Sequence, residues 1–163
     1  MAAHHLAQCN VARLLAPLDS PLLAGFVSQV DSINALAERS PGFIWHFQDE
    51  NGDAEVCRLF GDDMLLANMS VWTSVESLAA FTYKSAHRRV MRRRREWFST
   101  MVEAHLVLWW TSPGLLPTLH DAKARFDLLR AHGPSPEAFT FREAFPPPGD
   151  GPVTRDRSAE RPA

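Results

Sequence analysis

The chain has 163 residues, of which 45% are hydrophobic, and its formal net charge is −2 at pH 7. This length suits one domain with a substantial core, and the near-neutral charge argues against a general nucleic-acid-binding protein. No apolar run approaches the roughly 20 residues that cross a bilayer, and the N-terminus lacks the layout of a signal peptide. We therefore expect a cytoplasmic protein with no nucleic-acid and no membrane partner.

Hydrophobic periodicity and turn residues predict an order of β-α-β-(β)-β-α-β, followed by a further helix and an edge strand. The expected strands are at residues 6–15, 43–48, 54–60, 65–72, 105–110 and 139–145. The expected helices run from Ser20 to Pro41, from Thr73 to about Ser99, and from Thr118 to Gly133. Asn51–Gly52 predicts a hairpin turn, and Thr73 with Glu76 and Thr118 with Asp121 predict helix starts.

This order favours one α+β domain over residues 1–145, with a ferredoxin-like sheet and helices on one face. The other face of the sheet would carry many apolar and aromatic side chains, and so large an apolar face is rarely left in water. We therefore expect a homodimer that buries it. Residues 146–163 are rich in proline and arginine and poor in apolar residues, which is typical of a disordered tail.

The segment Asn68–Phe98 ends a strand in Val-Trp and continues with a Thr/Ser cap, an acidic residue, Leu-x-x-Phe and Ala-His. This pattern resembles the dimeric α+β-barrel superfamily. Over about residues 4–145 the chain resembles one bacterial family of unknown function within it. The resemblance is carried by the segments HLAQCNVARLLAPL, SPGFIWHFQDENGD, SAHRRVMRRRREWF, HLVLWW and LLRAHGPSPEAFTF. It implies a dimeric α+β barrel related to antibiotic-biosynthesis and haem-degrading monooxygenases.

The haem-degrading branch places an asparagine on its first strand and, in its second main helix, an aromatic residue followed by a haem-ligating histidine. Asn10, Phe81 and His87 resemble those positions. The chain has Phe where that branch has Trp, and its histidine comes about one helical turn earlier. The resemblance therefore implies either haem, with His87 as the iron ligand, or no cofactor.

His87 is the main candidate for chemistry. A neutral imidazole in a partly buried position can bind iron or act as an acid or base near neutral pH. A histidine bonded to a backbone carbonyl for structural reasons would occupy the same position. On one continuous helix, its stripe would consist of Tyr83, His87, Val90, Arg94, Trp97 and Met101.

Arginines surround this histidine, with Arg88, Arg89 and Arg92–Arg95 all within eight residues. Four consecutive residues cover every face of a helix, so the run cannot have a single role. Arg94 shares the stripe of His87 and could bind a ligand carboxylate through two hydrogen bonds. A solvated, salt-bridged helix face is the alternative interpretation.

Several strand residues are further candidates for a pocket. Tryptophans offer stacking surfaces, but they more often fill a core. His105 is expected on the same face as Trp109, and Asn10 would need a partner if it faces the helices. The assigned site residues are His87, Asn10 and Tyr83 for catalysis, Phe81, Arg94 and Trp97 around a cofactor, and Trp45, Trp72, His105 and Trp109 in the substrate pocket.

Three functions remain open. The first is a small-molecule oxidoreductase, monooxygenase-like or haem-binding, with a pocket between the sheet and the long helix. The second is a cofactor-independent isomerase, cyclase or monooxygenase of natural-product biosynthesis. The third is a non-enzymatic dimer that binds a ligand or responds to stress.

Overall fold

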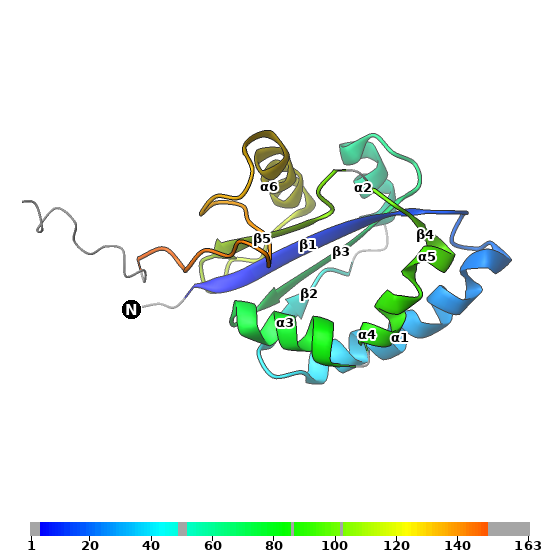
Figure 1. Ribbon diagram of the computed structural model, residues 1–163, viewed down its shortest axis with the longest axis horizontal. Coiled ribbons are helices and arrows are strands. Elements are labelled where there is room, and N and C mark those ends of the chain that lie inside the picture. The colour runs from blue at the N-terminus through cyan, green and yellow to red at the C-terminus, as the bar shows by residue number, and fades with distance from the viewer. Residues whose placement is uncertain (1–3, 49–51, 86, 102, 150–163) are drawn as a thin grey trace, which may run out of the picture.

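The computed structural model of the protein describes residues 4–48, 52–85, 87–101 and 103–149. Its centre is a five-stranded sheet with β1 in the middle (Figure 1). The strands are β1 (His5–Leu14), β2 (Phe43–His46), β3 (Leu65–Trp72), β4 (Phe98–Ser99) and β5 (Leu106–Thr111). The helices are η1 (Pro21–Leu23), α1 (Ala24–Arg39), α2 (Gly52–Phe60), α3 (Val75–Lys84), α4 (His87–Arg92), α5 (Arg94–Trp97) and α6 (Leu119–His132).

The strands follow the order β2-β3-β1, and both β4 and β5 pair with the remaining edge of β1. β5 pairs with the first part of β1, and β4 pairs with Arg13 and Leu14 at its end. The pairings are antiparallel, as in a ferredoxin-like βαββαβ fold. The predicted α+β, ferredoxin-like fold class is confirmed.

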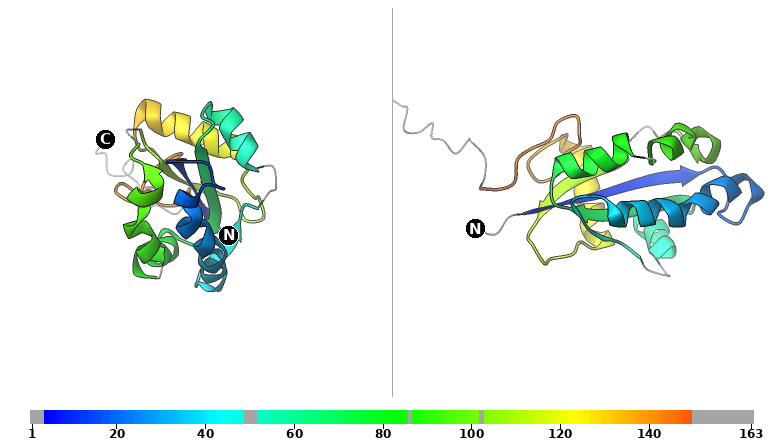
Figure 2. Two further views of the ribbon diagram at one scale, coloured as in Figure 1. Left: turned by 90° about the vertical axis from the view of Figure 1, so that its right-hand side faces the viewer. Right: turned by 90° about the horizontal axis from the view of Figure 1, so that it is seen from below.

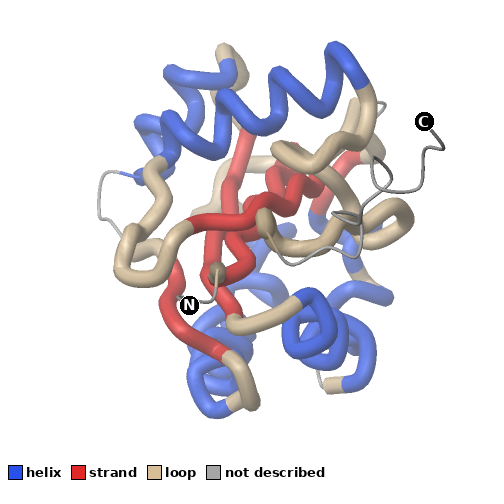
Figure 3. Tube along the Cα trace, turned by 90° about the vertical axis from the view of Figure 1, so that its left-hand side faces the viewer, coloured by secondary structure: helices blue, strands red, loops and turns tan. Residues whose placement is uncertain are grey.

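Alternate residues of β1 point to opposite faces of the sheet. Ala7, Cys9 and Val11 are buried in a core cluster with residues of α2 and α6. Leu6 lies on the opposite face, in a second cluster with residues of α1 and α3. Figure 3 shows the strands between two layers of helices. The sheet is therefore covered on both faces.

Residues 52–60 form the helix α2, so the strand predicted at residues 54–60 is wrong. Val56, Leu59 and Phe60 are three and four positions apart, which places them on one side of a helix. All three belong to or pack against the core on the Cys9 face. The predicted hairpin turn lies partly outside the described residues, and its glycine begins α2.

Helices α2 and α6 cover the sheet face that we expected a second copy of the chain to bury (Figure 1). Phe126 and Leu129 of α6 are buried in the core on that face. The expected placement of helices on one face therefore describes only α1 and α3–α5. Because α2 and α6 of the same chain cover this apolar face, the reason for expecting a homodimer no longer applies.

Two predicted helix starts can be compared with the structure. At α6, the Asp121 N–H donates to Thr118 Oγ1 at 3.1 Å and the Thr118 N–H donates to Asp121 Oδ2 at 2.8 Å, which confirms that capping box. The box before α3 begins one residue later than predicted, at Ser74, whose hydroxyl accepts from the Ser77 N–H at 3.1 Å. Thr73 instead donates its N–H to the carbonyl oxygen of Gly42, in the turn before β2, at 2.8 Å.

The long helix predicted up to about Ser99 is divided into α3, α4 and α5. The first break is at Ser85, where the backbone is extended and the hydroxyl donates to the Phe81 carbonyl. The second break is at Arg93, between α4 and α5. Side chains on either side of these breaks no longer follow one helical stripe, so the predicted stripe from Tyr83 to Met101 is interrupted.

The C-terminal edge strand is shorter than predicted. Phe139 and Leu108 exchange two backbone hydrogen bonds, of 2.8 and 2.9 Å, as an isolated bridge. Residues 150–163 of the predicted tail lie outside the described residues. Within the described ranges, no helix combines the length and the apolar character needed to cross a bilayer.

Candidate functional site

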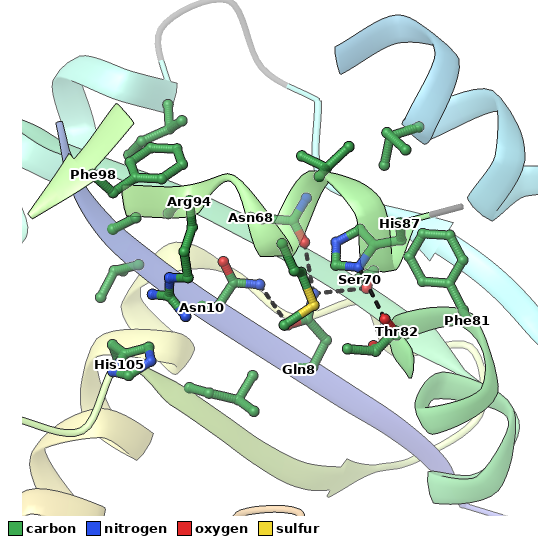
Figure 4. Close-up of a pocket in the computed structure, with 18 of the residues that line it drawn as sticks. Gln8, Asn10, Asn68, Ser70, Phe81, Thr82, His87, Arg94, Phe98 and His105 are labelled. Carbon is green, nitrogen blue, oxygen red and sulfur yellow. Dashed lines mark hydrogen bonds between the residues drawn. The ribbon is translucent and has the colours of Figure 1, made fainter. Parts of the chain in front are cut away.

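A cavity of about 360 Å³ lies between the sheet and the helices α1, α3 and α4 (Figure 4). Figure 2 shows α1 running beside α3–α5 over this face of the sheet. A cavity of this volume suits a small organic molecule. Its apolar lining includes Phe26, Val30, Ile33, Val90, Met91 and Phe98.

The sheet side of the cavity carries four polar side chains, which we call the polar row: Gln8, Asn10, Asn68 and Ser70. The register of β1 and β3 pairs Asn10 with Asn68 and Gln8 with Ser70, which brings the four side chains together. The Gln8 amide donates to Asn68 Oδ1 and Ser70 Oγ, both at 2.8 Å, and the Asn10 amide donates to Gln8 Oε1 at 3.2 Å. Gln8 is thus satisfied although it is only 3% exposed.

The polar row still has hydrogen-bonding groups for a ligand. Within the described residues, no hydrogen bond involves the side-chain oxygen Oδ1 of Asn10 or the side-chain nitrogen Nδ2 of Asn68. Asn68 is exposed and Asn10 is half-buried, and both line the cavity. A molecule in the cavity therefore finds one acceptor and one donor on the sheet side.

His87 lines the cavity at the start of α4, directly after the break at Ser85. Its ring lies 5.0 Å from the Phe81 ring, and its Nδ1 is 3.3 Å from the carbonyl oxygen of Thr82. A carbonyl can only accept, so this contact places the hydrogen of the neutral ring on Nδ1 and the lone pair on Nε2. Figure 4 shows the ring turned into the cavity, toward Asn68.

Burial lowers the pKa of His87, and the hydrogen bond to the Thr82 carbonyl opposes that shift only in part. The imidazole is therefore neutral at pH 7. No hydrogen bond within the described ranges involves Nε2. His87 has the protonation state and the free lone pair that a general base needs.

The other end of the cavity is lined by Arg94 and His105. Burial lowers the pKa of His105, and the charges of Arg94 and Arg130 lower it further. His105 is therefore also neutral at pH 7. In the part of the chain that the structure describes, no three His, Cys, Asp or Glu side chains form a group that could hold a metal ion.

Two of the predicted pocket tryptophans lie on the face of the sheet opposite the cavity. Trp45 and Trp109 belong to the core beneath α2 and α6 or pack against it. His105 lines the cavity, so the prediction that it shares a face with Trp109 is wrong. The strand β5 begins only at Leu106, and the alternation of side chains does not extend to residue 105.

Four other predicted residues differ in how they lie relative to the cavity. Trp72 and Trp97 are buried in separate core clusters and are not among its lining residues. Tyr83 lines the cavity but is 47% exposed, with its ring 5.5 Å from that of Phe141. Phe81 lines the cavity and separates His87 from Trp72, with ring distances of 5.0 and 5.2 Å.

Sequence analysis missed three members of the polar row: Gln8, Asn68 and Ser70. A signal for them was present, because each strand carries two polar residues two positions apart. The pattern becomes a site only through the pairing of β1 with β3, which places the two polar pairs side by side. That pairing cannot be read from either strand alone.

Haem is the cofactor that the superfamily resemblance suggests, and the cavity does not fit it. His87, with the lone pair on Nε2, is the residue that would hold the haem iron. The sheet side, however, carries the polar row, and a largely apolar porphyrin there would leave Asn10 Oδ1 and Asn68 Nδ2 without hydrogen-bond partners. Burying such groups without partners is unfavourable.

These features define an α+β domain of ferredoxin-like type with a cavity between its sheet and one layer of helices. The chain matches the family described as domain of unknown function DUF3291 over residues 5–155, and it belongs to that family. The expectation that the chain belongs to a family of unknown function is thereby confirmed, and its membership of the dimeric α+β-barrel superfamily stays a prediction. No curated protein and no solved structure matches the chain.

Proposed function

We propose that the protein is a cofactor-independent enzyme that binds a small, largely apolar molecule in the cavity and uses His87 as a general base. The observation that carries this proposal is the hydrogen bond from Nδ1 to the Thr82 carbonyl. It leaves the lone pair of Nε2 beside a cavity whose opposite side offers hydrogen-bonding groups. The resemblance to a superfamily with cofactor-independent members supports the same function.

The chemistry requires a substrate with a C–H bond next to a carbonyl group. The proton passes to His87 Nε2, and the electron pair remains on the substrate as an enolate. The amide N–H of Asn68 can stabilise the enolate oxygen. In a substrate with a further C=C bond conjugated to the enolate, return of the proton at the far carbon shifts the double bond and completes an isomerisation. The predicted monooxygenase-like reaction would begin with the same proton transfer, because an enolate can also react with dioxygen.

Deuterium exchange tests this proposal with 1-tetralone, an aromatic ketone with acidic C–H bonds, as the probe. In D₂O at neutral pH, the wild-type protein is expected to accelerate incorporation of deuterium beside the carbonyl, measured by NMR. His87→Gln keeps a polar side chain but has no basic nitrogen, so its acceleration is expected to fall by about 10²-fold or more.

His120→Gln is the matched control, because the His120 side chain is 72% exposed and does not line the cavity. This variant is expected to exchange the probe as fast as the wild type. Chemical-shift changes at His87 establish that the probe occupies the cavity. A bound probe whose exchange is the same with the wild type and with His87→Gln would contradict the proposed role of His87.

A further inference from the structure

The ionisable side chains that line the cavity are unbalanced in charge. Arg94, His87 and His105 are basic, Tyr83 is a phenol, and none of the described lining residues is an aspartate or a glutamate. Both histidines are neutral at pH 7, so Arg94 is the permanent charge among them. Arg94 is exposed to solvent and also lines the cavity, so a ligand there meets one full positive charge beside a largely apolar lining.

Arg93 and Arg94 are neighbours with different surroundings. The Nε of Arg93 donates to Glu96 at 2.8 Å, and its guanidinium lies 4.8 Å from the centre of the Trp97 ring. Within the described residues, Arg94 has no carboxylate at ion-pair distance. Figure 4 shows the Arg94 side chain reaching toward Asn10 at the end of the polar row.

The charge of Arg94 also affects the pKa of His105. Arg130 forms an ion pair with Glu103 at 3.3 Å and donates to the Ala104 carbonyl at 2.6 Å. Arg94 has no such partner in the described part of the chain, and its charge disfavours the protonated form of His105. An anion bound at Arg94 would offset this charge and raise the pKa of His105.

We propose that the ligand carries a carboxylate that binds the guanidinium of Arg94 beside Asn10. This inference rests on the proposed function and names its substrate class, a small organic acid with an apolar body. A guanidinium binds a carboxylate through two parallel hydrogen bonds. A single cation suits a monoanion better than a phosphate dianion, which usually has several cationic partners.

The orientation of the acid follows from the positions of the two basic groups. Figure 4 shows Arg94 and His87 on opposite sides of Asn68. With its carboxylate at Arg94, the apolar body extends along the side chains of α1 and α4 toward His87. The reacting carbon therefore lies away from the carboxylate, where Nε2 of His87 can reach it.

Three probes with one apolar body and different charges test the inference: 4-phenylbutyrate, 4-phenylbutyramide and 4-phenylbutylamine. Their affinities are measured by calorimetry, and their location is read from the NMR signals of His87 and His105. The wild type is expected to bind the acid at least about tenfold more tightly than the amide, and the amine most weakly. Arg94→Gln is expected to reduce the affinity for the acid to that for the amide.

Arg95→Gln is the matched control, because Arg95 is an adjacent, exposed arginine that does not line the cavity. It is expected to keep the preference for the acid, and Arg94→Lys is expected to keep part of it. Equal affinities of the wild type for acid and amide, with both shifting His87, would overturn this inference and leave the proposed function standing. A preference for the acid that survives in Arg94→Gln would overturn it too. Failure of all three probes to bind would count against the cavity as a ligand site, and thus against both proposals.

Discussion

Replacing Trp72 with alanine is expected to lower the free energy of unfolding by about 3–5 kcal/mol. The Trp72 side chain is 1% exposed, its ring stacks on Phe81 at 5.2 Å, and it meets the Phe43 ring edge-on at 5.4 Å. Its Nε1–H donates to Ser70 Oγ at 2.8 Å. Alanine removes these contacts and leaves a void at the end of β3, and chemical denaturation measures the loss.

Trp72→Phe separates the packing from the hydrogen bond. Phenylalanine keeps most of the aromatic volume and loses the indole N–H, so its loss of stability is expected to be smaller than that of Trp72→Ala. Because Phe81 lies between Trp72 and His87, the alanine variant is also expected to shift the NMR signals of His87. A loss below about 1 kcal/mol for Trp72→Ala would contradict the packing described for this end of the sheet.

Phe126→Ala is also expected to lower the free energy of unfolding by about 3–5 kcal/mol. Phe126 of α6 is fully buried, and its ring contacts that of Phe60 of α2 at a centroid distance of 5.8 Å. The guanidinium of Arg130 lies 4.9 Å from the same ring. The variant therefore tests whether α2 and α6 cover the second face of the sheet, and thermal or chemical unfolding measures it.

Leu116→Ala is the control for this experiment, because Leu116 is 47% exposed in the loop after β5. Its effect is expected to stay within about 0.5 kcal/mol. A similarly small effect of Phe126→Ala would mean that α6 does not cover the sheet. The uncovered apolar face would then again be a reason to expect a second copy of the chain there.

Local signals predicted much of the fold. The alternation in β1, β3 and β5 and the capping pair Thr118–Asp121 depend only on neighbouring residues, and the structure has the corresponding elements close to the expected places. The helix α2 was missed because a short apolar run fits both periods, and the Asn51–Gly52 turn signal favoured a strand. The break at Ser85 depends on a hydroxyl that bonds the Phe81 carbonyl, which a helical pattern does not reveal.

The site was less accessible to sequence reasoning than the fold. His87 and Arg94 could be named together because they are seven positions apart, which is two turns of the continuous helix that the sequence predicts, and both still line the cavity despite the break at Arg93. The face of the sheet on which Trp45 lies depends on an irregularity within β2. The position of His105 depends on where β5 begins. The polar row requires the pairing of two strands that are distant in sequence, and only the folded chain supplies it.

The most direct test of the account is an NMR titration of the His87 ring, with isotope-labelled histidine and with His87→Gln to assign the signals. The structure predicts a neutral ring protonated at Nδ1 and a pKa below about 6.5, the ordinary value for histidine. Nε2 then carries the lone pair at neutral pH. A ring protonated at Nε2, or a pKa above the ordinary value, would contradict the role of His87 as a general base in the cavity.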